Sequence, residues 1–157
     1  MPRRKRAEKK VYEPDLLYGN KIVTRFVNNI MRSGKKSVAE KIFYGAMEQI
    51  KAKTGEEPME VFTKAMDNVG PLVMVKSKRI GGATYQVPIE LSPEKREDTA
   101  IKWLISYSKK KSGKPMSQRL AEEMMDAAKG EGAAFKKRED THRMAEANKA
   151  FAHFGKF

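Results

Sequence analysis

Apolar residues recur every three or four positions through most of the chain, a spacing that is typical of amphipathic α-helices. Gly34, Gly55 and Gly130 follow such apolar stripes, whereas Pro58 and Pro93 suit the first turn of a helix. The stripes predict helices over Ile22–Met31, Val38–Ile50, Pro58–Val69, Pro93–Lys111 and Leu120–Ala128, and a last helix from about Ala133 towards Phe151. Phe43 and Trp103 lie on these stripes, so we expect both of them in the core.

One stretch, Leu72–Leu91, alternates with the two-residue period of a β-strand. The pair Gly81-Gly82 inside it can supply the two positive φ angles of a tight hairpin turn. A lone two-stranded ribbon is marginally stable in water, so we expect it to pack on another element. The predicted register pairs Ile80 with Ala83, Arg79 with Thr84, Lys78 with Tyr85 and Lys76 with Val87.

The predicted fold is therefore mainly α: a six-helix, bundle-like body with one protruding two-stranded antiparallel β-ribbon. Residues 1–13 are basic and almost free of apolar side chains, which predicts a flexible basic N-terminal arm. Residues 14–157 are then expected to form a single helical domain, with the ribbon at about 72–91. A length of 157 residues suits one such domain and leaves little room for a second.

The charge balance points to a polyanionic partner. Lys and Arg number 33 against 20 Asp and Glu, which gives a formal net charge of +13. Nucleic acid is the leading candidate for that partner, and an anionic membrane surface is the alternative. The basic N-terminus is not followed by an apolar run, and no stretch is long enough to cross a bilayer, so we expect a cytoplasmic protein without membrane contact.

The cations gather at the ends of the predicted elements. Any one cluster alone is better explained as a solvated face, but together they suit phosphate contacts, which give affinity and a steep salt dependence. Tyr85 is the best candidate for stacking on a base, since it shares a ribbon face with Lys76 and Lys78 while Arg79 points away. The candidate RNA-binding residues are Arg3, Arg4, Lys5, Arg6, Lys9 and Lys10 in the arm, then Lys35, Lys36, Lys76, Lys78, Arg79, Tyr85, Lys114, Arg119, Lys136, Lys137, Arg138 and Arg143.

Catalysis and metal binding find little support in the sequence. Glu139, Asp140 and His142 cluster, but cations surround them, so we interpret them as a charge cluster at a helix start. The chain has no cysteine, which excludes thiolate metal sites, and His142 and His153 alone do not make a metal site. We therefore predict no catalytic residue, no metal, no cofactor and no small-molecule substrate.

Three blocks of sequence resemble the bacterial small-subunit ribosomal protein seven family. The first is Ile22–Ser37, reading IVTRFVNNIMRSGKKS; the second is Val75–Pro88, reading VKSKRIGGATYQVP; the third is Lys136–His153, reading KKREDTHRMAEANKAFAH. The resemblance covers essentially the whole chain. The chain departs from the family pattern at its end, Gly155-Lys156-Phe157, which lacks the usual aromatic-arginine-tryptophan ending.

This resemblance implies a partner and a place in the cell. Proteins of this family bind the 3′ major domain of small-subunit ribosomal RNA and help nucleate assembly of the subunit head. They lie at the head–platform interface beside the exit site, near tRNA and mRNA, with head and platform ribosomal proteins as neighbours. The resemblance also implies which residues contact RNA: the basic arm, Lys35/Lys36, the ribbon cations and the Lys136–Arg143 block.

Two other functions remain open at this point. A DNA-architectural protein could use the basic ribbon as a minor-groove arm. An enzyme acting on RNA would need His142 or Glu139 for turnover, and it is the more distant of the two.

Overall fold

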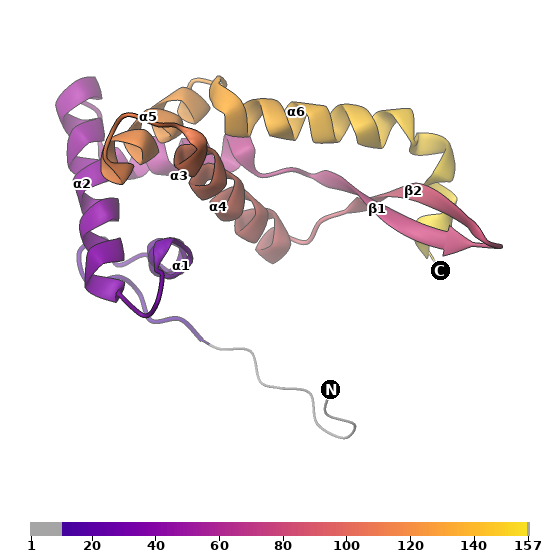
Figure 1. The fold of residues 1–157 in the computed structure, drawn as a ribbon, viewed down its shortest axis with the longest axis horizontal. Coiled ribbons are helices and arrows are strands. Elements are labelled where there is room, and N and C mark those ends of the chain that lie inside the picture. Colours follow the sequence, from indigo (N-terminus) through magenta and orange to yellow (C-terminus); the bar gives the residue numbers. More distant parts are fainter. Residues whose placement is uncertain (1–10, 157) are drawn as a thin grey trace.

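A computed structural model describes residues 11–156, and it consists of a helical body from which a β-ribbon projects (Figure 1). In Figure 1 the body lies at one end of the long axis and the ribbon at the other, with the final helix running between them. The elements are α1 (Lys21–Ile30), α2 (Lys36–Thr54), α3 (Pro58–Val69), β1 (Val73–Ile80), β2 (Ala83–Glu90), α4 (Pro93–Lys110), α5 (Met116–Ala128), α6 (Gly132–Ala147) and a 3-10 segment, η1 (Lys149–Lys156). The prediction of a mainly α fold with one β-ribbon is confirmed.

Three fully buried phenylalanines join the first three helices. Phe26 of α1, Phe43 of α2 and Phe62 of α3 have ring centroids 5.5 to 5.6 Å apart, two of the pairs being edge to face. Such pairs add to the stabilisation from burial alone. Helix α5 completes the core because it packs against α2, α3 and α4 and buries Leu120 and Met124. Phe43 is a core residue as predicted, and Trp103 packs half-buried against the same core.

Most of the predicted helix boundaries agree with the structure. Asn20 begins α1, since its side-chain oxygen accepts a hydrogen bond from the Ile22 amide at 2.8 Å. Gly55, at a φ of 71°, ends α2, and Pro58 and Pro93 occupy the first turns of α3 and α4.

Three predictions about the helices need correction. Helix α1 ends at Ile30, before Gly34, and the chain turns through Ser33 and Gly34 at positive φ. The last α-helix ends at Ala147 and not near Phe151, because the chain turns at Asn148 and continues as a 3-10 segment. The cluster of Glu139, Asp140 and His142 does not stand at a helix start, because α6 already begins at Gly132.

The register of the ribbon is the predicted one throughout. Ile80 pairs with Ala83, Lys78 with Tyr85 and Lys76 with Val87, and the strands are antiparallel. Gly81 and Gly82 have φ angles of 57° and 88°, as a primed hairpin turn requires.

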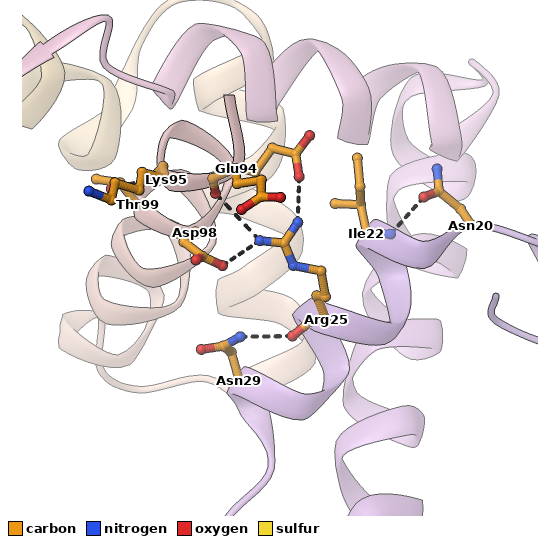
Figure 2. A network of polar contacts seen from close by, with 9 residues as sticks. Asn20, Ile22, Arg25, Asn29, Glu94, Lys95, Asp98 and Thr99 are labelled. Carbon is orange, nitrogen blue, oxygen red and sulfur yellow. Dashed lines mark hydrogen bonds and ion pairs between the residues drawn. The ribbon is translucent and has the colours of Figure 1, made fainter. Parts of the chain in front are cut away.

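Helices α1 and α4 are joined by the side chain of Arg25. Its guanidinium lies 2.5 Å from an oxygen of Glu97 and 2.5 Å from an oxygen of Asp98. Figure 2 shows the same group reaching towards the carbonyl of Glu94, at the start of α4. The Arg25 side chain is only 17% exposed, so the two carboxylates, and not water, supply most of the hydrogen-bond acceptors for its guanidinium. Arg25 is thus a structural cation.

Candidate nucleic-acid interface

The ribbon presents its cations in two different ways. Lys76 and Arg79 are exposed, and neither has a carboxylate partner among the described residues. Lys78 is half-buried instead, and its ammonium group donates a hydrogen bond to the Phe154 carbonyl at 2.8 Å. Tyr85, beside it, packs against Phe151 and Phe154. Arg79 therefore stands on the ribbon face turned away from η1, whereas Lys76 is exposed on the same face as Lys78 and Tyr85.

A second basic region lies at the turn between α1 and α2. Lys35 stands at the N-cap position of α2 and Lys36 is its first residue, and both side chains are exposed. No side chain caps the first amides of α2, so these N–H groups add to the attraction for an anion. Lys36 is also 3.6 Å from Glu40 in an exposed ion pair, which weakly offsets its charge.

The fold brings two further cations to this region that sequence analysis did not select. Arg32 and Lys109 line one open groove of about 340 Å³, together with Met116 and Arg119. Partial desolvation lowers the pKa of Lys109, and the positive charge of Arg32 lowers it further. Two cations that repel each other in this way favour an anion between them. Both residues stood in basic clusters of the sequence, but nothing in the sequence placed those clusters side by side.

Several predicted RNA-binding cations are engaged within the protein. Lys114 forms an ion pair with Glu122 at 2.5 Å, and the guanidinium of Arg138 lies 4.3 Å from the centroid of the Phe135 ring. Arg119 donates hydrogen bonds to the carbonyls of Lys109 and Lys111, so it closes the C-terminal end of α4. Arg143 lies 3.7 Å from Asp140, although Arg143 itself remains largely exposed.

The two remaining cations of the C-terminal block, Lys136 and Lys137, stand in the first half of α6. Lys136 is exposed and Lys137 half-buried, and neither has a carboxylate partner in the described part of the chain. The six arm cations, Arg3 to Lys10, lie outside the described residues. The candidate residues that are described thus do not gather in one patch, because the ribbon and the α1–α2 turn lie towards opposite ends of the long axis (Figure 1).

His142, which stands in the predicted charge cluster, has a structural role. His142 accepts a hydrogen bond on Nε2 from the backbone amide of Leu72 at 3.1 Å, which ties the base of the ribbon to α6. Within residues 11–156, no group of three or more His, Asp or Glu side chains is placed to hold a metal ion. No helix among the same residues has the length and apolar character that a membrane span requires.

The bond between His142 and Leu72 predicts a dependence of stability on pH. Burial lowers the pKa of His142 below its ordinary value of 6.5, and the positive charges of Arg138 and Arg96 lower it further. Below pH 6.5 the unfolded chain takes up a proton that the folded chain refuses, so this contribution to stability is complete above that pH and decreases as the pH falls. We expect the melting temperature to decrease from pH 7 towards about pH 5.

The matched variant is His142→Gln, because an amide oxygen can still accept a hydrogen bond but does not titrate. Thermal denaturation across the pH range should give a flatter profile for this variant than for the wild type. His153→Gln is the control, since His153 is exposed, and it should leave the profile unchanged. Equal profiles for His142→Gln and the wild type would contradict the assignment.

A helical body whose exposed cations follow a projecting ribbon and an uncapped helix N-terminus defines a structural nucleic-acid-binding protein. The sequence model of the family described as "Ribosomal protein S7p/S5e" matches residues 2–149 of the chain. Proteins called "Small ribosomal subunit protein uS7" from Ectopseudomonas mendocina, Pseudomonas putida and Pseudomonas syringae pathovar tomato are each 54% identical to it, over 98% of this chain and 99% of their own. The chain belongs to the ribosomal protein S7p/S5e family.

Membership of this family confirms the resemblance seen in the sequence. The family is one of ribosomal structural proteins and not of enzymes. The chain is therefore a protein of the small ribosomal subunit, and its partners are ribosomal RNA and other ribosomal proteins.

Proposed function

We propose that the chain binds the 3′ major domain of small-subunit ribosomal RNA and helps nucleate assembly of the subunit head. In this proposal it lies at the head–platform interface, near exit-site tRNA and mRNA, with head and platform ribosomal proteins as neighbours. The exposed cations Lys76 and Arg79 on the projecting ribbon, which have no carboxylate partner in the described chain, are the observation that carries the proposal. A net charge of +13 supports it, because that charge is costly without a polyanion.

The proposed mechanism is electrostatic docking at separate points on a folded RNA. The ribbon and the α1–α2 turn, with Lys35, Arg32 and Lys109, contact phosphates that would otherwise repel one another. Since the two regions stand towards opposite ends of the molecule, they suit two RNA segments held at a fixed separation. A-form RNA is recognised mainly through shape, phosphates and 2′-hydroxyls, so no base code is needed.

The other candidate residues are expected to contribute to RNA binding to different extents. Lys136 is a contact of the same open kind, Lys137 is a half-buried one, and the arm cations from Arg3 to Lys10 add further positive charge. Cations beside a carboxylate, such as Lys114 and Arg143, contribute less, because the acid repels the phosphate that the cation attracts. Arg119 and Arg138 act chiefly by holding the body in shape.

A competition binding assay tests this function against the DNA-architectural alternative. Labelled head-domain RNA is bound to the protein at fixed salt, and unlabelled head-domain RNA, unrelated RNA and duplex DNA are compared as competitors. We expect head-domain RNA to compete at least about tenfold better than the other two, because specific binding adds shape recognition to the common electrostatic term. Equal competition by duplex DNA would favour the architectural alternative and contradict the proposal.

A further inference from the structure

The C-terminal segment η1 packs on the ribbon and on α6, and it contacts no other helix or strand of the described chain. In Figure 1 the chain turns back where α6 ends and passes beside β2. Tyr85 of β2 lies 5.4 Å from Phe151 and 5.2 Å from Phe154, measured between ring centroids. The two phenylalanine rings are nearly parallel, at 13° and 6.4 Å, so the three side chains form one aromatic cluster.

The other strand is attached to the same segment through Lys78. Its ammonium group donates a hydrogen bond to the carbonyl of Phe154 at 2.8 Å. Carbonyls in the last turn of a helical segment lack partners inside it and carry partial negative charge, so a cation stabilises them. Lys78 and Tyr85 are direct partners in the register. Segment η1 therefore contacts β1 and β2 at one level of the ribbon.

Besides η1, helix α6 is the only other element of the described chain that contacts the ribbon. A two-stranded ribbon without further packing is marginally stable in water. Of the residues in β1 and β2, Val87 alone is fully buried, and Ser77, Gln86 and Thr84 are exposed. The bond from Leu72 to His142 ties only the base of the ribbon. The contacts with η1 lie farther along the ribbon, at Lys78 and Tyr85.

We infer that η1 is a clamp that sets the direction of the ribbon, with Phe151 and Phe154 as positioning residues. Successive side chains of a strand point to opposite faces, so Arg79 and Ser77 point away from the face of Tyr85. The clamp thus holds Tyr85 half-buried against η1 and leaves Arg79 on the open side. Residues 150–157 lie beyond the part that the family's sequence model matches. The contribution to RNA binding rests on the proposed function, whereas the clamp itself belongs to the free protein.

Hydrogen exchange on the free protein tests the clamp without any RNA. The variant is Phe151→Ala with Phe154→Ala, and the control is Met144→Ala, an exposed position on α6. We expect amide exchange between Lys76 and Val87 to accelerate at least about tenfold in the double variant, with the amides of α1 to α5 unchanged. The control should exchange like the wild type. Unchanged exchange in the ribbon of the double variant would overturn the inference.

A double-mutant cycle gives a second, independent measurement. Tyr85→Ala removes the other partner of the cluster, so it should accelerate the same amides, and adding Phe154→Ala should change them little further. Fully additive effects would mean that the rings act separately, which would also overturn the clamp. Far-UV circular dichroism checks that each variant keeps its helical content.

Measurements of RNA affinity then show whether Phe151 and Phe154 position the ribbon or contact the RNA themselves. The double phenylalanine variant removes no charge, so we expect its affinity for head-domain RNA to fall about three- to tenfold, with an unchanged salt slope. Arg79→Gln should instead reduce the salt slope and leave ribbon exchange unchanged. Tighter RNA binding by the phenylalanine variant would overturn the clamp, because it would make η1 a competitor of RNA. If the wild type shows no preference for head-domain RNA, the proposed function fails while the exchange result stands.

Discussion

Replacing Glu123 with alanine should lower the free energy of unfolding of the free protein by about 3 kcal/mol. Glu123 is fully buried between α5 and α6. One of its oxygens accepts the Ala134 amide at 2.8 Å, and the other lies 2.9 Å from the ammonium group of Lys111. Partial burial alone would lower the pKa of Lys111, but its bonds with Glu123 and Asp126 raise it. The substitution leaves the Ala134 amide, in the first turn of α6, without its hydrogen-bond acceptor. It also removes the nearer of the two carboxylates that pair with Lys111.

Chemical denaturation of three variants tests this expectation. Glu122→Ala is the matched control, because this neighbouring acid forms only partly exposed ion pairs with Lys114 and Lys53, and it should cost less than about 1 kcal/mol. Glu123→Gln keeps an oxygen for the Ala134 amide but loses the charge, so it should fall between the other two. Equal stability of the two alanine variants would show that the buried acid does not join α5 to α6.

Glu123 also shows how far the sequence alone reaches. It lies three residues after Leu120 and directly before Met124, so it falls on the apolar face of its helix by spacing. An acid on such a face is rarely left without a partner, which is a signal that could have identified it. The identity of the partner was out of reach, since Lys111 stands in a loop and Ala134 in the next helix.

At the interface, too, local features were predictable from the sequence, and contacts between distant segments were not. The ribbon register was predictable because Gly81-Gly82 fixes the turn, and the two-residue period then places every side chain. The helix ends marked by Gly55, Pro58 and Pro93 were also placed correctly, whereas α1 ends before Gly34. The approach of Arg32 to Lys109 and the contact of Tyr85 with Phe151 depend on long-range packing, which no local pattern encodes. Tyr85 was selected for stacking on RNA, but in the structure two rings of its own chain already contact it.

The placement of the cations leads to the largest expected effect on binding. Two variants are compared that each lose four positive charges. The first changes exposed cations without a carboxylate partner in the described chain, and it carries Lys35→Gln, Lys76→Gln, Arg79→Gln and Lys136→Gln. The second changes cations within 4 Å of a carboxylate, and it carries Lys53→Gln, Lys114→Gln, Arg143→Gln and Lys149→Gln.

We expect the first variant to lose about a hundredfold or more in affinity for head-domain RNA near 0.1 M salt, and the second less than about tenfold. Each lost phosphate contact should also reduce the slope of log K against log salt by about 0.7 to 0.9, so the first variant should show the flatter dependence. Fluorescence anisotropy over a salt series measures both quantities, and circular dichroism verifies that neither variant is unfolded. Because the net charge of the two proteins is equal, similar losses would mean that total charge governs binding. A difference in the expected direction requires that the fold presents particular cations to the RNA.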